Sequence, residues 1–158
     1  MATVNTAPVR KAVETAMEDL VGRIREEAAY RNKVASGGTL SALRTPVVSG
    51  EGYVLGTLTG GEHWKYVGNG RGPGRMPPIS KIEAWIASKA LPISAWAVAK
   101  RIAKEGSRDF RLGRTNIFLD SIDAWKESDA VDAVGQAGVL AFGNAYVQSI
   151  RDTFKPLA

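Results

Sequence analysis

The chain has 158 residues and a formal net charge of +5, which is the size and composition of one globular domain. It contains no cysteine and a single histidine, His63, so disulfides, thiolate metal sites and cysteine nucleophiles are excluded. We therefore expect no metal ion, no cofactor and no enzyme activity. No run of about 18 apolar residues occurs, so we expect no membrane span.

The positive charge is concentrated in the middle of the chain. Residues 65–114 contain 11 basic and 3 acidic side chains, whereas residues 115–158 contain 3 basic and 6 acidic ones. This distribution fits a basic surface that binds a polyanion, or a subunit whose basic face meets the acidic face of another. A solvated surface without a partner is a third interpretation. The candidate basic contact surface consists of Lys100, Arg101, Lys104, Arg108, Arg111 and Arg114.

The first 36 residues predict one long amphipathic helix. Apolar residues recur at spacings of three and four between Val9 and Ala28, which is the period of a helix with one apolar face. Thr6 is the expected N-cap, with Pro8 in the first turn, and the glycines at 37 and 38 end the element.

Residues 39–67 predict a small antiparallel β-meander. The segments 40–48, 53–59 and 64–67 are short, rich in β-branched or aromatic residues, and separated by glycine-containing turns. We expect three strands, with the first at an edge or interrupted at Pro46, which has no N–H group to donate.

A glycine- and proline-rich loop at residues 68–78 is followed by helices. Ser80 and Glu83 have the spacing of a capping box at the start of one helix, which Leu91 and Pro92 end. Ser94 is the expected N-cap of the next helix, and Gly106 is its expected C-terminal residue. Residues 108–114 then form a basic loop.

The C-terminal part predicts two more helices. The first carries an apolar stripe of Phe118, Leu119, Ile122 and Trp125, and the second begins at Ser128 or Asp129 and continues to Phe154. Gly135, Gly138 and Gly143 inside the second helix indicate either close packing of its backbone or a break. The expected fold class is α+β, in one domain spanning residues 1–158.

The glycine-rich loop does not match a phosphate-binding motif. Neither the G-x-G-x-x-G register nor the Walker pattern is present, although Arg71 and Arg75 leave a contact with an anion open. We predict instead that the loop contacts another subunit or protein, because its prolines restrict the chain and its glycines permit close approach. The candidate interaction loop consists of Gly68, Gly70, Arg71, Gly72, Pro73, Gly74, Arg75, Pro77 and Pro78.

Three apolar residues beside this loop are the candidate packing anchors. They are Trp64 before the loop and Ile82 and Trp85 after it. Because Ile82 and Trp85 share one face of the predicted helix, we expect them to attach it to the sheet or to the long N-terminal helix.

The stretch from residue 64 to residue 86, WKYVGNGRGPGRMPPI followed by IEAWI, resembles the strand–GRGPGKMPP–helix signature of tailed-phage virion proteins. This family comprises tail-completion, neck and head–tail joining proteins. Arg75 departs from the signature, in which lysine is commoner. The resemblance is at motif level over about residues 60–125.

The resemblance implies a structural protein of the virion, assembled in the bacterial host's cytoplasm. Such a protein forms a homo-oligomeric ring, about six-fold by analogy with phage tails, at the head–tail junction. Its partners would be further copies of itself, the head–tail connector or adaptor, tail proteins, and the DNA that passes through the lumen. A tail terminator protein of the same region and a sequence-nonspecific DNA-binding protein are the alternatives.

Overall fold

The structure, a computed structural model, describes residues 4–33, 38–61, 64–113 and 116–153. These residues form mainly helices with one small antiparallel sheet, which confirms an α+β composition. In chain order the elements are α1 (Ala7–Tyr30), α2 (Gly38–Ser41), β1 (Val47–Gly50), β2 (Tyr53–Gly56), α3 (Trp64–Asn69), α4 (Ile79–Ser88), α5 (Ala95–Glu105), α6 (Arg108–Arg111), α7 (Ile117–Lys126) and α8 (Asp129–Thr153). His63 and Phe154 lie outside the described residues.

The chain divides into two compact units, each built from separate stretches of sequence. Unit 1 comprises Met1–Arg23, Arg44–Thr59 and Ile122–Ala158, and unit 2 comprises Ile24–Leu43 and Gly60–Ser121. Helix α1 therefore contributes its first part to unit 1 and its last part to unit 2. The length of the chain predicts a single domain and does not reveal this division.

Helix α1 provides the core of unit 1 and confirms the predicted N-terminal helix. Its residues Val9, Ala16, Met17 and Leu20 are all buried. The helix begins at Ala7, so Thr6 holds the predicted N-cap position, and its backbone oxygen accepts from the Arg10 N–H at 2.9 Å. The side-chain bond to the first turn comes from Asn5, whose Oδ1 accepts from the Ala7 N–H at 3.1 Å. The helix ends at Tyr30, before the predicted end, and Gly37 lies outside the described residues.

The predicted three-stranded meander is wrong: β1 and β2 form a two-stranded hairpin, with Val48 opposite Leu55. An isolated bridge between Arg44 and Thr59 extends the pairing beyond Pro46, where the first strand is interrupted as predicted. Residues 64–67 belong to helix α3 instead of a third strand. A run of four residues, three of them aromatic or β-branched, is too short for its periodicity to separate a strand from a helix.

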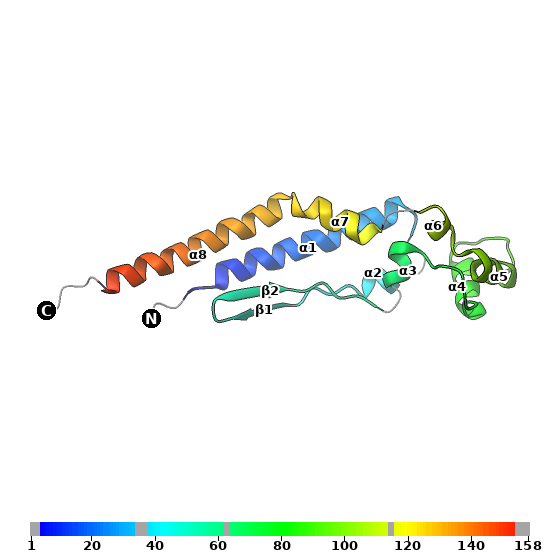
Figure 1. Ribbon diagram of the computed structural model, residues 1–158, viewed down its shortest axis with the longest axis horizontal. Coiled ribbons are helices and arrows are strands. Elements are labelled where there is room, and N and C mark those ends of the chain that lie inside the picture. The colour runs from blue at the N-terminus through cyan, green and yellow to red at the C-terminus, as the bar shows by residue number, and fades with distance from the viewer. Residues whose placement is uncertain (1–3, 34–37, 62–63, 114–115, 154–158) are drawn as a thin grey trace. The chain divides into compact units, whose positions relative to one another are not determined.

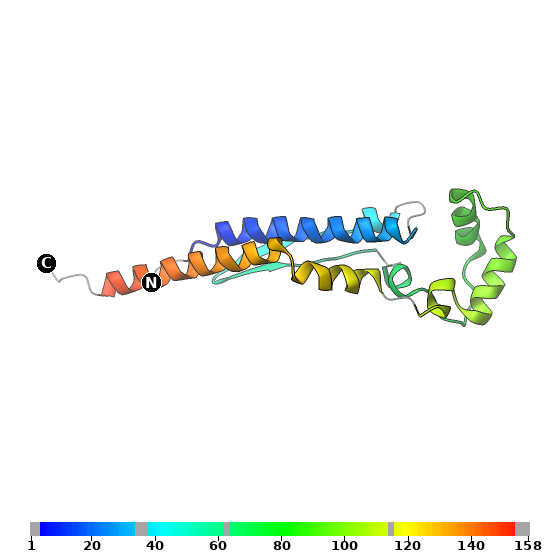
Figure 2. The ribbon, with the colours of Figure 1, turned by 90° about the horizontal axis from the view of Figure 1, so that it is seen from above.

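The hairpin lies directly on α1 within unit 1 (Figures 1 and 2). A Cβ atom on Gly56 would be 2.9 Å from Met17 Cγ and 3.0 Å from Val13 Cγ1, so only glycine fits the existing contact. Because side chains alternate along a strand, the opposite face of the hairpin points away from α1. We call this surface the outer face of the hairpin: Val48, Tyr53 and Leu55, each 55–56% exposed.

The second half of α7, from Ile122, and helix α8 complete unit 1. The indole Nε1 of Trp125, near the end of α7, donates to the backbone oxygen of Ala16 at 2.8 Å. Pro8 and Ala12 of α1 line a shallow groove together with Ala130 and Ala133 of α8, so the start of α8 runs beside α1. Ser128 occupies the N-cap position of α8, although its buried hydroxyl oxygen makes no hydrogen bond.

Neither close backbone packing nor a helix break explains the three glycines of α8. The helix is continuous across Gly135, Gly138 and Gly143, and a Cβ atom at any of these positions would meet no atom within 4 Å. Close packing within the described part of the chain and a helix break are therefore both wrong explanations.

Replacing Gly138 with alanine is expected to raise the free energy of unfolding by about 0.5–1 kcal/mol, because alanine loses less backbone entropy in a helix. Urea denaturation followed by circular dichroism measures the change. The matched control is Gly52→Ala in the hairpin turn, where the space is also open but φ is +77°, and where a loss of about 1 kcal/mol is expected. A destabilised Gly138→Ala variant contradicts the open packing.

In unit 2, α4 packs against α5. Ser94 accepts a hydrogen bond from the N–H of Ala97 at 3.5 Å, and Gly106 ends α5 with φ of +83°, which confirms both predicted ends. The predicted capping box of α4 is wrong. Pro78 holds the N-cap position with no side-chain bond, so Ser80 and Glu83 lie inside the helix. The fixed φ of proline suits a helix start, and the helix begins directly after it.

Candidate assembly surfaces

The first half of the glycine- and proline-rich loop is packed tightly within unit 2. Gly70 has φ of +75°, and a Cβ atom there would be 2.6 Å from Ser107 Oγ and 2.7 Å from the backbone nitrogen of Phe110. The Arg71 N–H donates to Ser107 Oγ at 2.9 Å, and the Ser107 N–H donates back to Arg71 O at 2.7 Å. The loop backbone is thereby fixed to the turn between α5 and α6.

Two further glycines also make close contacts inside this unit. A Cβ atom on Gly68, which lies in α3, would be 2.7 Å from Asn116 Oδ1, and one on Gly72 would be 3.3 Å from the Phe110 ring. These contacts account for the glycines without a partner protein. A role in contacts between proteins stays a prediction for the exposed part of the loop, residues 73–76 and Pro78.

The two arginines of the loop differ in their surroundings. Arg71 donates to Arg75 O at 2.6 Å, and its guanidinium lies over the Tyr66 ring, 5.7 Å from the centroid. Its side chain therefore helps to hold the loop, whereas Arg75 is exposed. Pro77 is buried, and Pro73 and Gly74 are exposed at the tip of the loop.

The predicted anchors do not form a core. Trp85 is 38% exposed, Ile82 is half-buried, and none of the described residues of α4 is buried. Within unit 2, α5 is the helix that packs against α4. The side chain of Trp64 lies outside the described residues, although its backbone begins α3.

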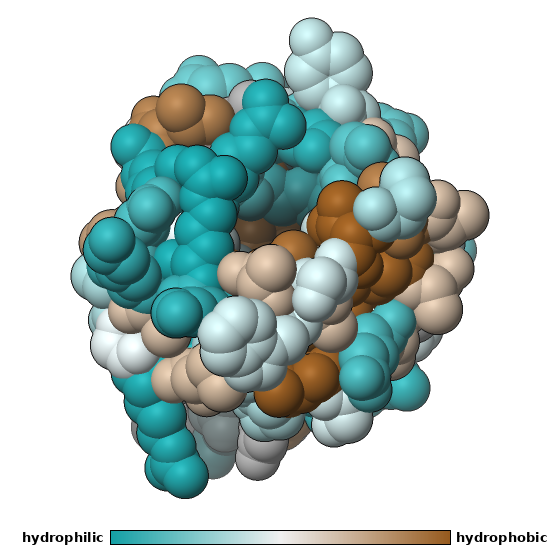
Figure 3. Space-filling view, turned by 90° about the vertical axis from the view of Figure 1, so that its right-hand side faces the viewer, coloured by the Kyte–Doolittle hydropathy of each residue, from teal (hydrophilic) through white to brown (hydrophobic). Residues whose placement is uncertain are grey.

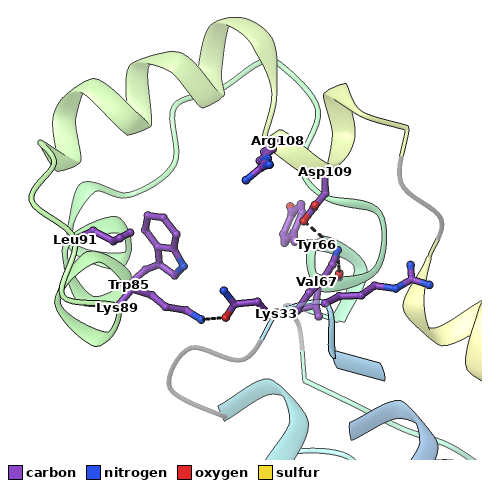
Figure 4. A pocket seen from close by; sticks show the side chains of 10 residues that line it. Lys33, Tyr66, Val67, Trp85, Lys89, Leu91, Arg108 and Asp109 are labelled. Carbon is purple, nitrogen blue, oxygen red and sulfur yellow. Dashed lines mark hydrogen bonds and ion pairs between the residues drawn. The ribbon is translucent and has the colours of Figure 1, made fainter. Parts of the chain in front are cut away.

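Trp85 lines an open cleft of about 740 Å³ in unit 2. Trp85 and Leu91 lie on one side, and Tyr66, Arg108 and Asp109 on the other (Figure 4). The face of unit 2 in Figure 3 is also hollowed, with hydrophobic side chains beside hydrophilic ones. The mixed walls suit a contact with another macromolecule better than tight enclosure of a small ligand.

The polar groups that line this cleft bind one another. Lys33, whose side chain is 6% exposed, donates to Val67 O and pairs with Asp109, both at 3.0 Å. Lys89 donates to Asn32 Oδ1 at 2.7 Å. These bonds hold the segment that follows α1 to α3, α4 and α6, and they give both lysines and Asp109 of the cleft a structural role.

Arg31 at the same cleft is held by two carboxylates. Burial by itself disfavours the charged guanidinium, but hydrogen bonds to Asp120 and Glu27 outweigh it and raise the pKa of Arg31. The guanidinium is thus permanently charged and joins α1 to α7 within unit 2.

The predicted basic surface lies on α5 and α6 and is exposed. Lys100 lies 4.8 Å from the centroid of the Trp96 ring, and Lys104 is in the last turn of α5. Arg101 and Arg111 pair with Glu105 at 3.1 and 3.4 Å, and the hydrogen bond from Arg101 lowers the pKa of that carboxyl. Arg108 is exposed as well, whereas Arg114 lies outside the described residues.

One exposed apolar surface was not predicted, and it lies on α8. Six large apolar side chains there are 40–74% exposed. We call this surface the outer face of α8: Val139, Leu140, Phe142, Tyr146, Val147 and Ile150. The sequence does carry a signal, because residues 137–147 contain one polar side chain, Asn144. A helix that is apolar on all sides is normally buried on all sides.

Among the described residues no group of three or more His, Asp or Glu side chains is placed to hold a metal ion. Within the same ranges, no helix combines the length and the apolar character that crossing a bilayer requires.

Comparison of the chain with protein-family models, with curated proteins and with solved structures finds no match.

Proposed function

We propose that this protein is a structural subunit of a tailed-phage virion, a neck or tail-completion protein that forms a homo-oligomeric ring at the head–tail junction and joins the tail to the capsid connector. The observation that carries the proposal is the outer face of α8. Six half-exposed apolar side chains leave on the order of 500 Å² of apolar surface uncovered, at the upper end for a stable monomer.

A permanent assembly explains this surface best. In a ring, each subunit covers the apolar surfaces of its neighbours for the lifetime of the particle. The apolar side chains that are exposed in the separate chain are therefore buried in the assembled ring. The exposed cations of α5 and α6 would meet an acidic neighbouring surface or the DNA path.

The assignment to a phage rests on the resemblance at residues 64–86. Helix α4 follows the loop as in the family's signature. The residues before the loop form helix α3, where the signature has a strand, so the chain departs from the family on that point.

The decisive experiment examines particles. Gold-labelled antibody against this chain, followed by cryo-electron microscopy of the virions, should locate a symmetric ring at the head–tail junction. A phage carrying a nonsense mutation in the gene should produce full heads and separate tails. Absence of the chain from purified virions overturns the proposal.

The exposed cations of α5 and α6 favour a second candidate function, that of a sequence-nonspecific DNA-binding protein. A ring subunit is expected to bind duplex DNA only weakly, whereas a DNA-binding protein would show sub-micromolar affinity with a steep fall as salt rises. Binding is measured by fluorescence anisotropy between roughly 50 and 200 mM salt. Lys104→Gln is the test variant and Lys81→Gln, on α4, the matched control.

A further inference from the structure

Unit 1 carries two exposed apolar surfaces on different elements. One is the outer face of the hairpin, and the other is the outer face of α8. We propose that the hairpin of one copy packs on the outer face of α8 of the next copy, and that this contact closes the ring. The inference rests on the proposed function, and it names the two surfaces that such a ring requires.

A cyclic ring needs two different complementary surfaces on each subunit, because one face of each copy meets another face of its neighbour. A single self-complementary surface produces only a dimer. The hairpin and α8 satisfy this requirement, since both belong to the same compact unit and each presents large apolar side chains.

The hairpin and α8 run in directions that suit a ring whose rotation axis lies along both elements. The turn of the hairpin lies toward the same end of unit 1 as the C-terminal end of α8, in both Figure 1 and Figure 2. The direction from the base of the hairpin to its turn is therefore parallel to α8. Such a rotation preserves direction, so the hairpin of one copy also runs parallel to α8 of the next.

Charges at the ends of the two surfaces match in this parallel orientation. The hairpin has Arg44 at its base and the exposed Glu51 at its turn, whereas α8 has the exposed Asp132 near its start and the exposed Arg151 near its end. Arg44 of one copy then lies toward Asp132 of the next, and Glu51 toward Arg151. The opposite orientation would bring Arg44 toward Arg151 and Glu51 toward Asp132.

The lengths of the two surfaces also agree. Arg44 and Glu51 are seven residue steps apart along the extended segment that includes β1, which span about 23 Å at roughly 3.3 Å per step. Asp132 and Arg151 are nineteen steps apart along α8, which span about 28 Å at roughly 1.5 Å per step. The long arginine side chains at both ends bridge the difference.

The area is sufficient for a specific contact. Three half-exposed hairpin side chains add on the order of 250 Å² to the apolar surface of α8. With the polar atoms around them, the two faces reach the roughly 1,000 Å² that a specific interface requires.

Cysteine crosslinking tests the contact, and the absence of native cysteine makes the background clean. Leu55→Cys marks the hairpin, and Gly143→Cys marks the outer side of α8 at a position with open space around the new Cβ atom. A short bis-maleimide should give a ladder of oligomers from the double variant and a covalent dimer from a mixture of the single variants. Each single variant alone should stay monomeric.

Two results overturn the inference. Dimerisation of the Gly143→Cys variant alone would show that α8 pairs with α8. Absence of crosslinks above the level of a Lys81→Cys and Gly143→Cys control would show that the two surfaces do not meet. Circular dichroism of each variant verifies that it is folded.

Charge exchange gives a second measurement. Glu51→Arg and Arg151→Glu should each lower the crosslinking yield about two- to five-fold, as expected for a pair at the rim of an interface, and the combined variant should restore it. A combined variant no better than the single ones contradicts the parallel orientation.

The failures of the two proposals are distinguishable. If the chains form the crosslinked ladder but are absent from virions, the contact between the hairpin and α8 is supported and the phage function is overturned. If the chains occur in virions but give no crosslinked ladder, the phage function is supported and the contact is overturned.

Discussion

Replacing Phe118 with alanine is expected to lower the free energy of unfolding by about 3–5 kcal/mol. Phe118 is only 2% exposed and is among the largest fully buried side chains of the described residues. Its neighbour Ile117 is completely buried, so the site belongs to the core of unit 2. Truncation there loses the transfer free energy of the ring and leaves a cavity that the packed surroundings fill only partly.

The matched control is the next residue. Leu119 is 58% exposed, so Leu119→Ala should change the free energy of unfolding by no more than about 0.5 kcal/mol. Urea denaturation of both variants, followed by circular dichroism, measures the difference. Equal losses in the two variants would show that α7 is rotated from the orientation described.

Replacing Gly70 with alanine is expected to cost about 2–4 kcal/mol. A left-handed conformation in a residue other than glycine costs about 1–3 kcal/mol. The new methyl group would also lie 2.7 Å from the backbone nitrogen of Phe110, which cannot rotate away as a side-chain end can. The same denaturation experiment measures the loss.

Gly72→Ala is the control for the Gly70 variant. Its Cβ atom would approach the Phe110 ring at 3.3 Å, and its φ lies outside the left-handed range, so a loss below about 1 kcal/mol is expected. A Gly70→Ala variant as stable as Gly72→Ala would contradict the close packing of the loop on residues 106–110.

The sequence predicts the helices well where a local signal acts alone. Ser94 caps α5 and Gly106 ends it, because a hydroxyl acceptor and a residue tolerant of positive φ are needed at those positions whatever surrounds them. The long α1 is predicted by periodicity sustained over many residues. Short segments fail, since a few residues such as 64–67 carry too little pattern to decide between helix and strand.

The roles of the predicted site residues depend on packing, which composition alone does not predict. Glycines at 68, 70 and 72 suggest an interaction loop, yet each lies against a neighbour that only the folded chain brings close, such as Asn116 or Phe110. Leu119 and Phe118 are equivalent on a sequence stripe, but the packing of α7 buries one and exposes the other. The outer face of α8 could have been found, because residues 137–147 contain a single polar side chain, Asn144.

The interleaving of the two units has a consequence for synthesis in the cell. Every residue of unit 2 precedes α8 in the chain, whereas unit 1 needs α8 beside the first part of α1. During translation, unit 2 can therefore fold before α8 has been synthesised, when the N-terminal half of α1 does not yet have α8 to pack against. The apolar surface of α8 exists only when α8 has left the ribosome, which delays association between nascent chains on one polysome until each is complete through α8.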